Sequence, residues 1–446
     1  MVLWGREGSN PSPGAILLVQ NFISVSPYNR DEDSGPSLKP SILYGECQSR
    51  GGELRTVTRT SASLKDIAVY FLKLGFIAFG GPAAHIAMME EETVRRRHWL
   101  SREKFLDLLG AANMIPGPSS TELAIYIGYV QAGWMGLVLA GVCFILPAAI
   151  IVTALAWVYV HYGSLPQVVS ILYGVKPVVI AIILQALWNL GRSAVKTKYL
   201  LVVGAGGLIL SVLGINPILT IFGMGSITGL GRWFANVKKK RASFLSLCLL
   251  FLVPLLAYVV EIGATVIEPS SSTFGLWPLF LVFLKMGSVI FGSGYVLLAF
   301  LRAELVVHLH WITDSQLLDA IIVGQVTPGP VFTTATFIGF LLAGPIGGLV
   351  ATVGIFLPAF IAVAISGPIV PRIRSSPIAG AFLDGVIVAS LALMVFVTYE
   401  LAVSALVDVV TIGIVIVSSV LLIRFHVNSM WIIALGTLIG VVKFII

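Results

Sequence analysis

Two copies of a Pro-Gly-Pro motif stand out in this chain, and hydroxyl side chains follow each copy. Proline cannot continue a helix, so a helix that starts after the motif presents unpaired backbone N–H groups and its positive dipole end. Together with the hydroxyls, these groups make a candidate anion site. The alternative is a structural kink whose hydroxyls bond to their own helices. The residues concerned are Pro116, Gly117, Pro118, Ser119, Ser120 and Thr121 in one copy, and Pro328, Gly329, Pro330, Thr333 and Thr334 in the other.

A few ionisable residues lie inside apolar segments, where they are costly and therefore functional candidates. Lys73 and Lys285 occupy equivalent places, so both ammonium groups could reach one central site for a dianion, or each could extend to an interface instead. Glu122 could carry a coupling proton or make a structural hydrogen bond. His85 could titrate in its place or be an ordinary core residue. Lys176 and Asp384 are expected to pair with each other.

The composition identifies the setting of these residues as a membrane. The 446 residues are 57% hydrophobic and 11% charged, with a mean hydropathy of +0.97, whereas soluble domains carry charge on about a quarter of their residues. Long, unbroken apolar runs exclude a single-span receptor and a β-barrel. In a membrane protein, a net charge of +7 indicates basic residues in the cytoplasmic loops. We therefore expect no nucleic acid partner. Cys47, Cys143 and Cys248 have unrelated spacings, so we expect no disulfide framework, structural metal or cofactor.

An internal repeat organises the chain. FLKLGFIAFG, which begins at Phe71, recurs 212 residues later as FLKMGSVIFG from Phe283. Over the 48 columns from Phe71 to Pro118 the two copies share 16 identities. After a slip of one residue the match continues with Gly128 and Gly339. Secondary transporters are often built from two such halves.

The charges of matching loops predict that the two halves are inverted. Basic residues mark the cytoplasmic side, and they are plentiful from Arg95 to Lys104, whereas the matching loop near Val307 keeps only Arg302 among Glu304 and Asp314. The loop near His161 is uncharged, but its counterpart has Arg372 and Arg374. We therefore predict an all-α polytopic fold with inverted repeats, a cytoplasmic N-terminus and an external C-terminus.

The predicted segments follow from this topology. Two apolar stretches lie between the inner loop at 91–104 and the outer loop at 161–165, but only an odd number of crossings can connect loops on opposite sides. We therefore predict that the first stretch is re-entrant: two half-helices that meet at the Pro-Gly-Pro break and return to the same side. The first segment of each half is expected to fold back at Gly80-Gly81-Pro82 or at Gly292-Ser293-Gly294. The expected units are a disordered N-terminal extension (1–65), a first repeat (66–235), a linker with an extra transmembrane helix (236–273) and a second repeat (274–446).

These motifs together resemble the chromate ion transporter (CHR) family in its two-domain, long-chain form. The FGGP, RRxWL, FLDL, PGPxSTE and IGY elements occur in order, and the resemblance covers roughly residues 65–446. It implies export of chromate and chromate resistance, with protons or another anion such as sulfate as coupling partner. Ser119 departs from the family pattern, in which Asn is more frequent. By the match of its motifs to this sequence, the resemblance implies these candidate functional residues: Gly80, Gly81, Pro82, His85, Glu92, Arg96, Trp99, Pro116, Gly117, Pro118, Ser120, Thr121 and Glu122.

Several functions remain open at this point. The leading prediction is a secondary transporter in the cell membrane that exports a tetrahedral dianion through a site between the two Pro-Gly-Pro breaks. The alternatives are an anion channel or a sulfate or molybdate transporter on the same scaffold. A membrane reductase lacks any flavin or dinucleotide motif to support it, so we expect no enzyme activity. Membrane lipid is an expected partner, and a homodimer is left open.

Overall fold

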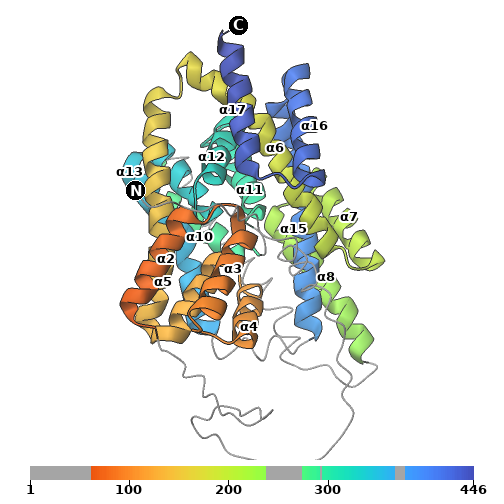
Figure 1. Ribbon diagram of the computed structural model, residues 1–446. Helices are drawn as coiled ribbons and strands as arrows, with labels where there is room; N and C mark the ends of the chain where they lie inside the picture. Colours follow the sequence, from red (N-terminus) through yellow and green to blue (C-terminus); the bar gives the residue numbers. More distant parts are fainter. Residues whose placement is uncertain (1–61, 238–273, 292–293, 367–376, 446) are drawn as a thin grey trace, which may run out of the picture. The chain divides into compact units, whose positions relative to one another are not determined.

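The structure is a computed structural model that describes residues 62–237, 274–291, 294–366 and 377–445 (Figure 1). The described residues form helices and include no strand, as the predicted all-α fold requires. Residues 1–61 of the predicted N-terminal extension (1–65) and the apolar run at 244–260 lie outside the described residues, and α2 already begins at Leu64. The first repeat contains α2 (Leu64–Ile77), α3 (Gly81–Glu90), the π-helix η1 (Glu91–Arg96), α4 (Arg102–Ala112), α5 (Ser119–Tyr162), α6 (Pro166–Ala194), α7 (Lys198–Val212) and α8 (Pro217–Val237).

The second repeat follows the same order. Its elements are α10 (Leu276–Val289), α11 (Val296–Leu301), the π-helix η2 (Arg302–His308), α12 (Asp314–Val326), the short 3-10 helix η3 (Val331–Thr333), α13 (Thr334–Ser366), α15 (Pro377–Ala405), α16 (Val409–Arg424) and α17 (Ser429–Ile445). Four of the described helices, α5, α6, α13 and α15, are long and apolar enough to cross a membrane. The protein is therefore a multi-pass integral membrane protein.

The α5 helix is two antiparallel arms joined by a tight turn. Ala132 and Gly133 leave helical geometry, with Gly133 at φ 59°. A Cβ placed on Gly128 would lie 2.2 Å from the Gly136 carbonyl oxygen, so the arms touch backbone to backbone. The first arm covers 119–131 and the second 134–162. In α13 the turn is at Ala343 and Gly344, and Gly339 lies against Gly347 in the same way.

The helices before α5 also double back. The Tyr70 hydroxyl donates to the Met88 carbonyl at 3.3 Å, which places α3 alongside α2. Gln131, at the end of the first α5 arm, donates from Nε2 to the Trp99 carbonyl at 2.8 Å. Since Trp99 lies just before α4, the chain runs from Trp99 through α4 and the Pro-Gly-Pro break and returns to the level at which it started.

The two repeats run in opposite directions, as the loop charges predicted. The second α5 arm begins near Trp99, beside the N-terminal end of α4, which we call its base. Its other end lies beside α12, where the Tyr159 hydroxyl donates to Asp319 Oδ2 at 2.8 Å. Because α12 is the counterpart of α4, the bases of these two helices lie at opposite ends of one long helix.

One ion pair recurs in both repeats with its charges exchanged. Arg302 Nε lies 2.8 Å from Asp314 Oδ1 in the second repeat. At the two equivalent positions of the first repeat, Arg102 Nε lies 3.7 Å from Glu90 Oε1. The contact is kept while the sign at each position is reversed. The inverted repeat thus preserves helix packing and adapts the charges at matching sites.

Candidate functional site

Turns from both repeats meet at the centre of the fold. The Gly117 N–H donates to the carbonyl of Ile290 at 2.8 Å, and the Gly329 N–H donates to the carbonyl of Ala78 at 2.9 Å. Ala78 and Ile290 are the residues that end α2 and α10. Each Pro-Gly-Pro break is therefore bonded to the end of the first helix of the opposite repeat.

Both motif glycines are fixed by tight packing and unusual backbone geometry. Gly117 has φ +137° and Gly329 has φ +93°, conformations that L side chains rarely adopt. A Cβ on Gly329 would lie 2.8 Å from the Cβ of Ala148, and one on Gly117 would lie 3.4 Å from the Cβ of Ala359. Ala148 belongs to α5 and Ala359 to α13, so each break also rests on the long helix of the opposite repeat.

His85 connects three elements of the first repeat at this centre. It is 1% exposed, and its Nε2 lies 3.1 Å from the Ala78 carbonyl, which can only accept. Nε2 therefore carries the proton, and in the neutral ring Nδ1 accepts from the Ser120 hydroxyl at 3.3 Å. The ring also packs edge-on against Phe144, with centroids 5.5 Å apart. His85 thus joins the end of α2 to the start of α5.

Glu122 is the carboxyl group that faces the first break. It is fully buried, and neither carboxyl oxygen has a hydrogen-bond partner among the described residues. Oε1 lies where a Cβ on Gly117 would be only 2.3 Å away, so the carboxyl points at the turn. The neighbouring Thr121 hydroxyl is also buried without a partner in the described chain. Buried polar atoms are normally bonded, so this pair marks a place that a ligand or proton would complete.

The second break lacks this polar cluster. Thr333 Oγ1 donates to the Pro330 carbonyl and Thr334 Oγ1 to the Val331 carbonyl, each at 2.8 Å. These hydroxyls bond to their own chain, as one of the two interpretations of the motif supposed. The counterparts of His85 and Ser120 are the apolar Leu297 and Phe332. The unsatisfied carboxyl and hydroxyl groups are thus found after the first break, while the second break has only the amide nitrogen of Gln325, three residues before Pro328, without a partner in the described chain.

The two repeat-related lysines have different surroundings. Lys285 is mostly buried, and its Nζ lies 3.1 Å from Glu304 Oε2. Lys73 lies on the exposed side of α2, among exposed Leu72, Phe76 and Ile77. The structure does not bring the two ammonium groups together. The counterpart of Glu304, Glu92, is bound instead by Arg97 Nε at 2.7 Å.

The remaining residues carried over from the resemblance fall into two groups. Gly80, Gly81 and Pro82 form the turn between α2 and α3, with both glycines at positive φ and Pro82 in the first turn of α3. Glu92, Arg96 and Trp99 lie at the base of the hairpins, away from the central turns. Arg96 pairs there with Glu91 and Glu92, and the buried Trp99 packs edge-on against Tyr70.

The expected pair between Lys176 and Asp384 is wrong. Lys176 Nζ lies 3.1 Å from Asp319 Oδ1, and Asp384 is bound by Lys196 at 2.8 Å. Positions close to each other by repeat symmetry need not touch, because the inverted packing places α6 beside the base of α12. Sequence reasoning missed Asp319 as a functional candidate, although its identity with Asp107 in the other repeat was a signal.

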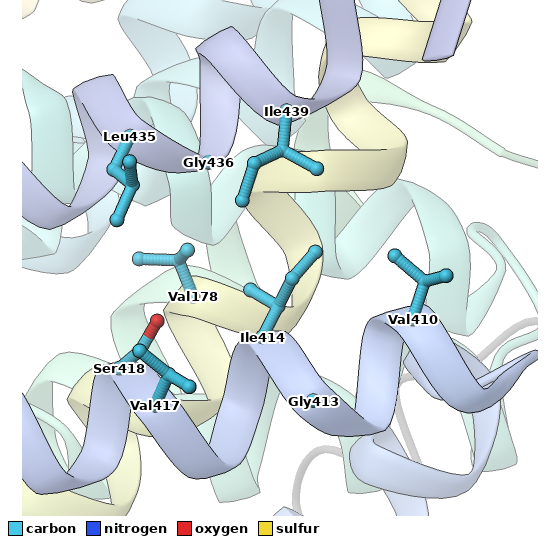
Figure 2. Close-up of a pocket in the computed structure, with 9 residues that line it drawn as sticks. All are labelled: Val178, Val410, Gly413, Ile414, Val417, Ser418, Leu435, Gly436 and Ile439. Carbon is cyan, nitrogen blue, oxygen red and sulfur yellow. The ribbon is translucent and has the colours of Figure 1, made fainter. Parts of the chain in front are cut away.

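A separate cavity of about 260 Å³ lies between α6, α16 and α17 (Figure 2). Ser418 supplies the one hydroxyl of its lining, which is otherwise aliphatic or glycine. Such a lining suits a hydrocarbon chain better than a dianion, which needs donors for its oxygens. The residues that line it are Val178, Val410, Gly413, Ile414, Val417, Ser418, Leu435, Gly436 and Ile439.

Inverted repeats with broken helices that meet at the centre of a polytopic membrane fold define a secondary-transporter class of architecture. The family model described as Chromate transporter matches residues 65–230 and 277–441. The chain belongs to this family, which is one of transporters, and the resemblance seen in the sequence is thereby confirmed.

Named relatives agree with this assignment. A probable chromate transport protein of Synechococcus elongatus is 36% identical over 332 residues, covering 74% of this chain and 82% of its own. A chromate transport protein of Cupriavidus metallidurans is 32% identical over 389 residues, covering 87% and 95%. An uncharacterized transporter of Bacillus subtilis, YwrA, is 33% identical over 134 residues, or 29% of this chain and 75% of its own. No solved structure matches the chain.

Proposed function

We propose that this protein exports chromate from the cytoplasm and so confers chromate resistance, with the oxyanion bound between the two Pro-Gly-Pro breaks. The observation that carries the proposal is Glu122, a buried carboxyl without a hydrogen-bond partner in the described chain, which faces the first break. The names of the relatives from Synechococcus and Cupriavidus support chromate as the substrate.

In the proposed mechanism the two central hydrogen bonds break to admit the substrate. The Ala78 and Ile290 carbonyl oxygens now accept from the Gly329 and Gly117 N–H groups. When the turns separate, oxyanion oxygens take the place of these carbonyl oxygens. Ser119, Ser120 and Thr121 add hydroxyl groups beside the first break. Backbone donors suit an oxyanion because they bind it without adding a full positive charge, which keeps its release possible.

Glu122 is the proposed proton carrier, with His85 as the neighbouring group that could replace it. An ionised Glu122 would repel a dianion, since two unit charges about 5 Å apart interact by roughly 3 kcal/mol at an effective dielectric constant of about 20. Protonation of Glu122 therefore accompanies oxyanion binding. A dianion that leaves with one proton carries one net negative charge outward, which an inside-negative membrane potential favours.

The test uses everted vesicles with imposed pH gradients and membrane potentials. Labelled chromate uptake should respond to both in the wild-type protein, and unlabelled sulfate and molybdate should be compared as competitors. Glu122→Gln should bind chromate with an affinity that no longer depends on pH. Glu103→Gln, at an exposed position on α4, is the matched control and should behave as wild type.

Three results would overturn parts of this proposal. Unchanged pH dependence in Glu122→Gln would remove the proton role and favour His85 or anion exchange. Flux that never proceeds against an opposing chromate gradient, whatever pH gradient or potential is imposed, would favour the channel. Stronger competition by sulfate than by chromate itself would make this a sulfate transporter on the same scaffold.

A further inference from the structure

A buried pair of hydroxyls joins the two repeats near Glu122. Tyr126 lies on the first arm of α5, and Ser366 is the last residue of α13. Their hydroxyl groups are hydrogen bonded, and both side chains are buried. The Ser366 hydroxyl also lies 3.2 Å from the Val363 carbonyl, to which it donates. Ser366 therefore accepts its other bond from the Tyr126 hydroxyl.

Tyr126 lies four residues after Glu122 on the same helix. Side chains at this spacing are neighbours on one helix face, and long side chains in helices lean back over the preceding turn. The Glu122 carboxyl interacts electrostatically with the Tyr126 phenol. The phenol is thus bonded to Ser366 and lies within electrostatic range of a carboxyl that has no hydrogen-bond partner in the described chain.

The hydroxyl pair lies between Glu122 and the cytoplasmic base of the first repeat. The first α5 arm starts at the central break and ends at Gln131, which bonds to Trp99. Trp99 lies between the basic residues at Arg95–Arg97 and Arg102, the side that we assign to the cytoplasm. Tyr126 is one helical turn further toward that side than Glu122.

The second repeat has none of these groups. Counted from the matching glycines Gly128 and Gly339, the position of Tyr126 is held by Phe337 and that of Ser366 by Leu155. Phe337 packs against the Tyr159 ring, with centroids 5.2 Å apart. Thr333 and Thr334 stand where Glu122 would be. Polar groups thus lie on the cytoplasmic side of the centre, and the inverted copy is apolar at the positions that match Tyr126 and Ser366.

We propose that Ser366 and Tyr126 form the route by which a proton passes between the cytoplasmic side and Glu122. The inference rests on the proposed role of Glu122. In the loading step both hydroxyl groups rotate away from their present acceptors, Tyr126 gives its proton to the Glu122 carboxylate and receives the Ser366 proton, and the Ser366 proton is replaced from cytoplasmic water. Both hydroxyls end unchanged, and the net result is one protonated carboxyl. Tyr126 and Ser366 carry the proton and so set the rate of this transfer, but they act on the substrate only through Glu122.

The other titratable groups on the described elements around this arm are engaged elsewhere or exposed: the Tyr70 hydroxyl of α2 donates to the Met88 carbonyl, and Glu90 of α3 pairs with Arg102. On the elements packed against the first α5 arm, His85 is held by Ala78 and Ser120 on the other side of Glu122, and Asp319 is held by Lys176 at the far end of the second arm. α13 contributes no charged residue. The charged groups of α2 and α4 are exposed: Lys65, Asp66, Lys73, Arg102, Glu103, Lys104 and Asp107.

The test separates the rate of proton transfer from chromate binding. In proteoliposomes with a pH-sensitive dye and chromate as substrate, Tyr126→Phe should slow the flux that follows a pH jump by at least about tenfold. The pH dependence of chromate affinity at equilibrium should stay as in wild type, because Glu122 is intact. Tyr129→Phe removes a phenol from the same helix and should leave both quantities unchanged.

Ser366→Ala is the second variant, and it removes only a hydroxyl, so it keeps the test decisive if Tyr126→Phe folds poorly. It should slow the same flux. Wild-type rates in a folded Tyr126→Phe or Ser366→Ala protein, together with lost pH dependence in Glu122→Gln, would overturn the route and leave the proposed function standing. Unchanged pH dependence in Glu122→Gln would overturn both.

Discussion

The Gly117 N–H donates to the carbonyl of Ile290 at 2.8 Å, and this bond ties the first Pro-Gly-Pro break to the end of α10 in the other repeat. The equivalent residues, Gly329 and Ala78, make the equivalent bond at 2.9 Å. Each repeat supplies the donor of one bond and the acceptor of the other, as a two-fold relation between the halves requires. Neither break can change position without disturbing the opposite repeat.

The first prediction is that Gly329→Ala destabilises the protein and blocks transport. A Cβ there would lie 2.8 Å from Ala148 in a backbone conformation of φ +93°. Strain of this kind costs on the order of 1–3 kcal/mol. The thermal midpoint in detergent and the chromate flux in vesicles should both fall.

Gly413→Ala is the control for this substitution. Gly413 lies in α16, and nothing lies within 4 Å of a Cβ placed there. Alanine is the better helix former, so the midpoint should hold or rise slightly. Equal losses in both variants would show that glycine content, and not the central contact, decides stability.

The second prediction concerns the ion pair with exchanged charges. Arg302 is mostly buried and binds Asp314 at 2.8 Å and Glu400 at 2.9 Å. Arg302→Ala would leave two carboxylates facing each other and should cost about 2 kcal/mol, less than a fully buried pair would, because both acids are partly exposed. Arg102→Ala, at the exposed equivalent pair, should cost under about 1 kcal/mol. Denaturation midpoints of the two variants compare them, and a larger loss in Arg102→Ala would contradict this order.

The sequence predicted the parts of the fold that depend on pattern. Repeated glycines and prolines mark turns and breaks whatever surrounds them, and loop charges report the membrane side. The break after Ala112 could be predicted from Pro116 and Pro118, and the turn at Gly80 from a glycine that can adopt positive φ.

The partners of individual side chains could not be predicted in the same way. Lys73 and Lys285 are identical by alignment, yet one is exposed and the other is bound to Glu304. The difference comes from Arg97, which forms an ion pair with Glu92 in the first repeat. In the second repeat the position of Arg97 is held by Leu309, so Glu304 is left to pair with Lys285. The repeat gives matching residues the same backbone position. Their side-chain contacts differ where the neighbouring residues differ between the two copies.

The third prediction is the membrane orientation. In a protein with Cys47, Cys143 and Cys248 replaced by Ser, Ser164→Cys should react with a membrane-impermeant maleimide added to intact cells. Glu103→Cys should react only after the cells are opened, because the first turn of α4, where Glu103 lies, is beside the basic residues that mark the inside. Labelling of both positions from the same side would contradict the assignment.

The fourth prediction concerns acid stability. The Tyr173 hydroxyl and the Thr411 N–H donate to Asp408 at the start of α16 and lower its pKa to about 2. A carboxyl whose pKa is depressed in the fold stabilises above its unfolded value near 3.8, and this contribution is lost as pH falls toward 2. The difference in thermal midpoint between wild type and Asp408→Asn should therefore be constant above about pH 5 and shrink below it. A difference that grows as the pH falls would contradict this account.

The last prediction returns to the breaks themselves. Six residues, Asn113 to Pro118, separate α4 from α5, and within them Pro116 and Pro118 prevent helical bonding of the chain. Pro116→Ala with Pro118→Ala should let α5 extend backward in part, and a helix that extends uses N–H groups that would otherwise bind the oxyanion. Chromate affinity should fall about tenfold, or about 1.4 kcal/mol, although no charge is removed.

Gly117 keeps its own positive φ in this double variant, so the turn to Ile290 should survive and the protein should still reach the membrane. Equilibrium binding of labelled chromate to purified protein measures the effect, and Pro147→Ala, a proline inside the second α5 arm, is the control for general helix changes. Unchanged affinity in the double variant would mean that the N–H groups at the start of α5 do not bind the oxyanion, because the variant leaves the Gly117 N–H in place. The Gly117 N–H, the hydroxyls and the second break would then have to supply its recognition.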